Sequence, residues 1–281
     1  QKITFLYFGD TGTGSTEQKL VAAKMKETCD KVGGCDFAIL VGDVVYPNGF
    51  SKSFDKIVES DLQEVKDKFE IPYQNFGRFD IWIAPGNHDW KGNIQHHINY
   101  SAQSERWRMP FNHYQIPGLP EWLSLYAADT TRILDFWKKK SKDDKNDDLV
   151  EDQLDSKTVH YAGEVGVGSI EQQLCTKKGH KIIFAHHPLF DAEYNKWRDE
   201  NAKTLSTLML PIMEKCGIKT FLAGHSHNLQ HTEVTYNGKV YHNAVSGGAG
   251  KLEELHTQQT TLTGYNNKFV KSYYGFSVVT A

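Results

Sequence analysis

The sequence contains five short apolar runs, each followed at once by residue types that bind metal ions. The runs have the composition of β-strands and cover 3–8, 37–41, 79–84, 181–185 and 220–223. The residues that follow them are Asp10, Asp43 with Tyr46, Asn87, His186, and His225 with His227. In open α/β sheets, ligands gather beyond the carboxyl ends of the strands. The repetition therefore predicts an α/β fold with a dinuclear metal centre at the C-terminal ends of its strands.

Length and composition favour one folded domain over residues 1–281. Hydrophobic residues make up 39% and charged residues 24%, which is ordinary for a globular protein. No apolar stretch approaches the roughly 20 residues that a membrane span needs. The net charge of −3 gives no overall basic surface, so we expect no nucleic-acid partner.

The start of the chain and its cysteines indicate an oxidising compartment. The chain begins at Gln1 and enters a predicted strand almost at once, as a secreted, lysosomal or vacuolar protein does after removal of a signal peptide. The turn-forming pair Gly33-Gly34 can bring Cys29 and Cys35 together, and we favour two disulfides, Cys29–Cys35 and Cys175–Cys216. Four reduced thiols are the alternative. Asn99 begins an Asn-Tyr-Ser glycosylation sequon.

The remaining pattern alternates helices and strands. We predict helices over 15–28, 54–69 and 203–215, the last of which stops at Gly217. Strands at 239–245 and 273–279 lack following helices, which indicates a mixed sheet. Residues 138–155 are nearly all charged or small and polar, so we expect a mobile charged insertion there. It is either a lid or protease-sensitive regulatory segment, or a surface insertion without a role.

The mixture of ligand types predicts the kind of metal. Carboxylate, amide and imidazole groups together suit transition metals better than calcium. A phenolate from Tyr46 is a hard donor that favours Fe(III). His225 and His227 are one residue apart and project to the same side of an extended backbone, so they can reach two adjacent ions. Asp43 is the natural bridge between those ions.

The other histidines are predicted to have structural or surface roles. His187 directly follows His186 and should face the opposite way, where it would orient the ligand rather than bind the ion. The remaining histidines do not follow a predicted strand as the ligands do. They are His96, His97, His113, His160, His180, His231, His242 and His256.

Five ordered segments resemble the motifs of the purple acid phosphatases, a family of the calcineurin-like metallophosphoesterase superfamily. They are Asp10-Thr11-Gly12, Gly42-Asp43-Val44-Val45-Tyr46, Gly86-Asn87-His88-Asp89, His186-His187-Pro188 and Gly224-His225-Ser226-His227. The likeness is to the small tartrate-resistant branch, and it spans most of the chain apart from the charged insertion. Gly12 together with Tyr46 is typical of the members that hold iron through a tyrosinate.

The resemblance implies a four-layer α/β sandwich, with two mixed sheets flanked by helices. It implies Fe(III) bound by Asp10, Asp43, Tyr46 and His227, and a second divalent ion, Fe, Zn or Mn, bound by Asp43, Asn87, His186 and His225. The implied activity is that of an acid phosphatase, which hydrolyses phosphate monoesters by attack of a metal-bound hydroxide. Small phosphorylated molecules or phosphoproteins would be its substrates.

The resemblance also assigns roles around the ions. His88 would hold the phosphate beside Asn87 and assist the leaving group, with orientation of Asn87 as its alternative role. Asp43 would take part in catalysis as the bridging ligand, and Asp89 and His187 would orient the ligands. The family's further histidine is missing from 191–195, so Tyr194 or Asn195 is expected to bind substrate instead.

Two other functions are consistent with the same sequence. One is a phosphodiesterase or nucleotide hydrolase at the same centre, which Gly12 and Tyr46 disfavour. The other is a catalytically silent relative that serves as an anchor or binding module, because a fold can host new functions. Silent relatives typically lose metal ligands, whereas this chain has all seven.

Overall fold

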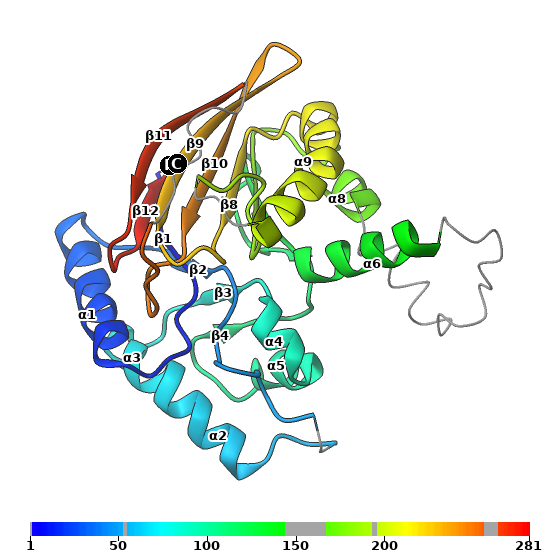
Figure 1. Ribbon diagram of the computed structural model, residues 1–281. Coiled ribbons are helices and arrows are strands. Elements are labelled where there is room, and N and C mark those ends of the chain that lie inside the picture. The colour runs from blue at the N-terminus through cyan, green and yellow to red at the C-terminus, as the bar shows by residue number, and fades with distance from the viewer. Residues whose placement is uncertain (1, 53–54, 144–166, 193–195, 256–263) are drawn as a thin grey trace.

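Two β-sheets form the centre of the molecule, and helices cover their outer faces (Figure 1). The computed structural model describes residues 2–52, 55–143, 167–192, 196–255 and 264–281. The first sheet has the strand order β12-β1-β2-β3-β4. Its strands are β1 (Thr4–Phe8), β2 (Phe37–Leu40), β3 (Ile81–Ile83), β4 (Trp107–Arg108) and β12 (Ser277–Thr280). The first four run parallel, and β12 pairs antiparallel with β1, which places the two ends of the chain side by side.

The second sheet has the order β11-β9-β10-β8-β7-β6-β5. Its strands are β5 (Tyr114–Gln115), β6 (Leu123–Ala128), β7 (His180–Ala185), β8 (Thr220–Ala223), β9 (Leu229–Tyr236), β10 (Lys239–Ser246) and β11 (Tyr265–Lys271). Strands β6, β7, β8 and β10 are parallel, whereas β5, β9 and β11 pair antiparallel with their neighbours. Both sheets are therefore mixed.

Helices pack on the outer face of each sheet. The helices that alternate with the strands of the first sheet are α1 (Thr16–Lys31), α2 (Glu59–Val65), a π-helical turn (Lys66–Glu70), α3 (Ile71–Tyr73), a 3₁₀ turn (Gln74–Phe76), α4 (Asn87–Lys91) and α5 (Ile94–Tyr100). The second carries α6 (Thr130–Asp143), α8 (Val167–Leu174) and α9 (Lys196–Cys216). The predicted four-layer sandwich of two mixed sheets is confirmed.

Strand β1 shows how the layers are held together. Its residues alternate between two cores: Leu6 and Phe8 pack with the α1 side, whereas Phe5 and Tyr7 pack between the sheets. All of β1 is buried, because both of its faces are covered. Burying one such side chain contributes about 1.5–3 kcal/mol, so a continuous apolar run is what this position requires.

Most of the predicted elements form, with shifted ends. Helix α1 begins after Ser15, whose side chain accepts a hydrogen bond from the backbone N–H of Gln18. Helix α9 starts earlier than expected and ends at Cys216, before Gly217 with its φ of 68°. The predicted helix 54–69 is wrong at its start: α2 begins only at Glu59, after the β-branched pair Ile57-Val58.

Two further expectations need correction. The predicted strand 273–279 is shorter, because Gly275 donates a backbone hydrogen bond to Gly248 O and β12 begins only at Ser277. The start of the predicted charged insertion is not a loop, since residues 138–143 continue helix α6. The rest of that insertion, 144–155, lies outside the described residues.

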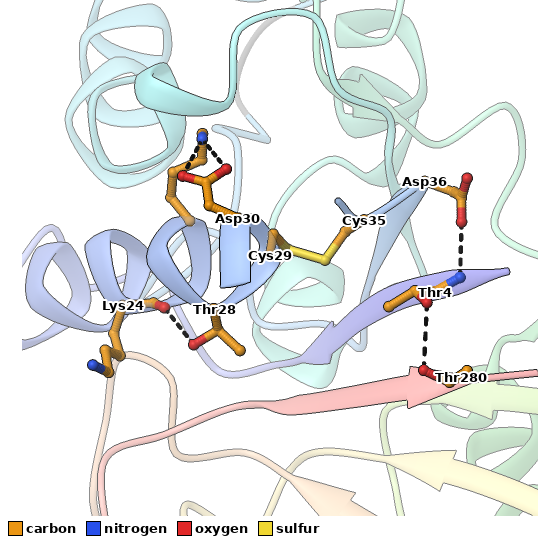
Figure 2. The surroundings of a disulfide bond; sticks show 9 residues. Thr4, Lys24, Thr28, Cys29, Asp30, Cys35, Asp36 and Thr280 are labelled. Atoms are coloured by element: carbon orange, nitrogen blue, oxygen red, sulfur yellow. Dashed lines mark hydrogen bonds and ion pairs between the residues drawn. A yellow bond between two sulfur atoms is a disulfide. The ribbon is translucent and has the colours of Figure 1, made fainter. Parts of the chain in front are cut away.

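Both predicted disulfides are present. Cys29 at the end of α1 is bonded to Cys35 just before β2, with their Cα atoms 5.2 Å apart (Figure 2). In the same view, Asp36 accepts a hydrogen bond from the backbone N–H of Thr4 at 2.7 Å, which ties β1 to the start of β2. Cys175 after α8 is bonded to Cys216 at the end of α9. The first bond joins a helix to the start of a strand, and the second joins two helices.

Among the described residues, no helix is long and apolar enough to span a membrane.

Candidate metal centre

The predicted ligands come together where strands of both sheets end. Asp10 and Asp43 follow β1 and β2, Asn87 follows β3, and His186 and His225 follow β7 and β8. Two groups of residues could each hold a metal ion, because the ligand atoms within a group all lie within 4.8 Å of one another. One group is Asp10, Asp43 and His186, and the other is His186, His187 and His225. His186 belongs to both groups. Such a cluster can hold two neighbouring cations that share a bridging ligand.

One side of this cluster is built around Tyr46. Its hydroxyl donates a hydrogen bond to Asp10 Oδ1 at 3.2 Å and lies 3.2 Å from His227 Nε2. His227 Nε2 is 3.5 Å from the same Asp10 oxygen. Burial and the charges of Asp10 and Asp43 hold the pKa of Tyr46 well above its usual value. The phenol therefore keeps its proton in this anionic surrounding, and only a strongly charged cation would convert it to phenolate.

The other side is built around His186. Its Nδ1 lies 2.8 Å from Val41 O, and a proton on Nδ1 that is donated there leaves Nε2 directed at the cluster. His186 Nε2 is 2.9 Å from Asn87 Oδ1, 3.2 Å from His225 Nδ1 and 3.5 Å from Asp43 Oδ1. The expected ligands of the divalent ion therefore lie around a single nitrogen, His186 Nε2.

The electrostatic surroundings of His186 fit a cation site. Burial alone would lower the pKa of His186, but the nearby charges of Asp43 and Asp10 outweigh it and raise the pKa above 6.5. The same negative charges would favour a metal ion at Nε2, which faces Asn87 Oδ1.

The backbone at three of the predicted ligands is strained. Asp10, Asp43 and His225 have φ values of 59°, 55° and 68°. Residues other than glycine seldom adopt this left-handed conformation, and such strain clusters at functional sites. Two neighbouring glycines have no room for a side chain: a Cβ on Gly12 would lie 2.3 Å from Val44 O, and one on Gly86 would lie 2.2 Å from Asp43 Oδ1. The loops are therefore packed to position these side chains.

Asp89 braces the loop that carries Asp43. One of its oxygens accepts hydrogen bonds from the backbone N–H groups of Asp43 at 2.9 Å and Gly86 at 2.8 Å, and the other accepts from Val44 at 3.0 Å. Burial and the charge of Asp43 raise the pKa of Asp89 to about 7. Through these contacts Asp89 links the loops after β2 and β3, and its orienting role stays a prediction.

His187 does not lie as strand alternation predicted. Its ring centroid is 4.4 Å from that of His225, and it belongs to one of the two possible ligand groups. The reason is that β7 ends at Ala185, so the alternation of a strand no longer applies to His186 and His187. His187 Nδ1 is 3.0 Å from Thr130 Oγ1, which also accepts the backbone N–H of His187. Burial lowers the pKa of His187 well below 6.5 and keeps the ring neutral.

His88 stands at the partly exposed edge of the cluster. Its ring packs edge-on against Tyr46 with centroids 4.7 Å apart, and its Nδ1 is 2.5 Å from Pro47 O. Lys91 Nζ lies 3.1 Å from His88 Nδ1 and 3.3 Å from His88 Nε2. The sequence indicated a role for His88 but none for Lys91, whose ammonium group lies beside the expected phosphate.

A buried acid that the sequence did not reveal precedes Thr130, the residue that contacts His187. Asp129 follows β6 and accepts hydrogen bonds from Trp90 Nε1 at 3.1 Å, Asn112 Nδ2 at 2.7 Å and the backbone N–H of Arg132 at 3.1 Å. Burial raises the pKa of Asp129 to about 7. The signal was present, since the run Leu123–Ala128 precedes this aspartate as the other runs precede their ligands.

Two predicted substrate-binding positions, Tyr194 and Asn195, lie outside the described residues. Asn99 is exposed on α5, where its Oδ1 accepts a hydrogen bond from Gln95 Nε2 at 3.0 Å, and its glycosylation stays a prediction.

Comparison with known proteins relates the fold and these motifs to phosphoesterases. The Calcineurin-like phosphoesterase family model matches residues 3–229. Tartrate-resistant acid phosphatase type 5 of Oryctolagus cuniculus is 25% identical over 269 residues, which cover 92% of this chain and 74% of that protein. Purple acid phosphatase 7 of Arabidopsis thaliana is 26% identical over 280 residues, covering 97% and 76%.

Two solved structures share the fold. GAP50, described as the anchor in the inner membrane complex of Plasmodium, has a TM-score of 0.72 at 16% identity and covers 99% of this chain and 81% of its own. The purple acid phosphatase PPD1 of yellow lupin (Lupinus luteus) seeds has a TM-score of 0.59 at 15% identity, covering 100% and 49%. At these identities the similarity speaks for the fold alone.

Proposed function

Because the chain belongs to the calcineurin-like phosphoesterase family, we propose that it is an acid phosphatase that hydrolyses phosphate monoesters at a dinuclear centre of Fe(III) and a divalent ion. The observation that carries this proposal is the convergence of Asp10, Tyr46 and His227 on one side and of Asn87, His186 and His225 on the other, with Asp43 between. The similarity to tartrate-resistant and purple acid phosphatases supports it.

The donor set fits the two ions differently. On the Tyr46 side a phenol, a carboxylate and an imidazole suit Fe(III), and on the His186 side an amide oxygen and two imidazoles suit Fe(II), Zn²⁺ or Mn²⁺. When bound, the pair of ions would supply Lewis acidity toward the phosphoryl group and make water more acidic.

The protein's own residues would hold and orient the substrate. Asn87 and His88 begin helix α4, and His88 faces the partly exposed side of the cluster together with Lys91. A phosphate there would receive positive charge from Lys91. The imidazolium form of His88, with Nδ1 donating to Pro47 O, would donate a hydrogen bond from Nε2 and then pass that Nε2 proton to the leaving oxygen. Asp89 and the strained backbone at Asp10 and Asp43 would keep the ligands in place.

The two disulfides support a location of the protein in an oxidising compartment. Two disulfides that join helix to sheet and helix to helix suit an oxidising compartment, so we place the protein outside the cytosol, in a secreted, lysosomal or vacuolar setting.

The test is hydrolysis of an aryl phosphate monoester and of the matching diester at acid pH by the purified protein, together with its metal content and visible spectrum. Monoester hydrolysis with two metals per chain and an iron–tyrosinate band supports the proposal. A preference for the diester would indicate a phosphodiesterase, and a colourless protein that cannot be loaded with iron would contradict the role of Tyr46.

The second candidate function is a non-enzymatic anchor. The structural similarity to GAP50, with a TM-score of 0.72, favours it. A protein that binds two metals yet hydrolyses neither ester would support the anchor, whereas turnover that is lost when His186 is replaced would exclude it.

A further inference from the structure

A pair of histidines meets on β9 and β10, on residues that the candidate metal centre does not use. Val234 and Tyr241 of these strands lie in the core beneath α9. Because side chains alternate along a strand, His231 and His242 point to the opposite face of the sheet. His231 lies across from Ala244, and His242 is two residues before it on the same face. The two imidazoles are therefore diagonal neighbours, close enough for their rings to meet.

The separation of the two rings matches that of two ligands on one ion. His231 Nε2 and His242 Nδ1 are 3.2 Å apart, and the ring centroids are 5.4 Å apart. Imidazole nitrogens bind Zn²⁺ at about 2.0–2.1 Å, so two of them on a tetrahedral ion lie about 3.3 Å apart. Little movement is needed to place a cation between the rings.

The charge state of the pair also suits a cation. Both histidines are half-buried, and burial together with His242 lowers the pKa of His231. Metals bind the neutral imidazole, so a lowered pKa keeps His231 available over a wider pH range. The 3.2 Å contact then requires one ring nitrogen to carry the shared proton, and an ion would displace it.

A carboxylate stands beside the pair. Glu233 lies directly across from His242 and two residues after His231, on the same face. It forms an ion pair with Lys268 at 3.0 Å, and both side chains are partly exposed. Exposed ion pairs are weak, so Glu233 can turn away from Lys268 to become a third ligand.

We infer that His231 and His242, with Glu233, form a second cation site, separate from the candidate centre, that binds a divalent transition ion such as Zn²⁺. Two imidazoles and one carboxylate favour Zn²⁺, Ni²⁺ and Cu²⁺ over Mg²⁺ and Ca²⁺. The ion would clamp β9 to β10, the hairpin that begins just after His227 and ends at Ser246. Figure 1 shows this hairpin beside β11, where the second sheet reaches its edge.

The test is equilibrium dialysis of the protein against micromolar Zn²⁺ after its candidate centre has been saturated with metal, with the metal per chain measured by mass spectrometry. The wild type should bind one ion more than His231→Asn and His242→Asn, each of which should bind it at least about tenfold more weakly. His180→Asn, which changes an exposed histidine at the start of β7, is the matched control and should bind like the wild type.

Two further readouts sharpen the result. Glu233→Gln should weaken Zn²⁺ binding by about tenfold, and Zn²⁺ should raise the melting temperature of the wild type but not of His231→Asn. Equal melting temperatures of all variants without Zn²⁺ show that they fold. The inference is overturned if the wild type binds no additional ion, or if both histidine variants retain it.

Discussion

The two sides of the candidate centre present different groups to a cation. On the Tyr46 side the nearest ionisable hydroxyl has a pKa raised by burial and by two aspartates, so it keeps its proton. On the His186 side the same aspartates act against burial and raise the pKa of an imidazole. One negative field thus makes both the phenol and the imidazole hold a proton more strongly. Under the proposed function, the Tyr46 side is the one that needs the more strongly charged ion, because a phenol there must give up its proton.

The largest expected effect comes from removing the shared nitrogen of the His186 side. His186→Ala takes away the atom that faces Asn87, His225 and Asp43, so monoester hydrolysis should fall on the order of a thousandfold. Metal analysis should show about one ion fewer per chain. His180→Ala at the other end of β7 should change neither kcat nor metal content, and a similar loss in both variants would show that the effect is structural.

The Tyr46 side should respond differently to removal of its hydroxyl. Tyr46→Phe keeps the buried ring but loses the oxygen near Asp10 and His227, so the visible band of the iron-loaded protein should disappear. Activity should fall by roughly tenfold to a hundredfold, less than for His186→Ala, because the other ligands remain. The measurement is the absorption spectrum with kcat on the same sample. A band that persists in Tyr46→Phe would remove Tyr46 from the iron site.

A smaller effect is expected at the edge where substrate would enter. Lys91→Met removes the ammonium group beside His88, so kcat/KM for an aryl phosphate should fall about tenfold. Lys91→Arg should restore most of the loss, because it keeps the charge. Lys19→Met on the exposed face of α1 is the control, and an equal loss there would show a general effect of surface charge.

The last prediction concerns stability rather than catalysis, at the buried Asp129. The pKa of Asp129 is about 7 in the fold, above its usual value of 3.8, so the folded protein binds more protons than the unfolded chain between these pH values. The free energy of unfolding should therefore fall as pH rises from about 4 to 7, by at most about 4 kcal/mol from this group.

Urea unfolding at several pH values tests this. Asp129→Asn should lose most of that decline, whereas Asp55→Asn, at an exposed position, should keep it. Identical pH dependence in Asp129→Asn and the wild type would show that Asp129 is ionised throughout this range.

The sequence was most informative where one residue type recurs in one local setting. Asp10, Asp43, Asn87, His186 and His225 each follow an apolar run, and the structure brings all five to one edge. That the ligands lie at strand ends follows from the pattern, whereas their origin in two sheets was implied only by the resemblance to the purple acid phosphatases. Asp129 also follows an apolar run directly, but it was not predicted because its segment is not among the motifs that resemble the family.

Sequence patterns were less informative at boundaries and for side chains that meet through space. The orientation of His187 depends on the end of β7 at Ala185, and no residue of the strand predicts that end. Lys91 and His88 are three residues apart, but their contact requires the short helix α4. His231 and His242 were predicted to be surface or structural histidines, and only the register of β9 and β10 shows that they are neighbours.

The sequence by itself determined the main strands, the turn that brings Cys29 and Cys35 together and the chemical types of the ligands, because these depend on local periodicity, turn residues and donor atoms. Only the tertiary structure decided which ligands share His186, which groups carry protons and which backbone positions are strained. These properties arise from burial and from distances between residues far apart in the chain. Electrostatic energy depends steeply on such distances, and no local pattern contains them.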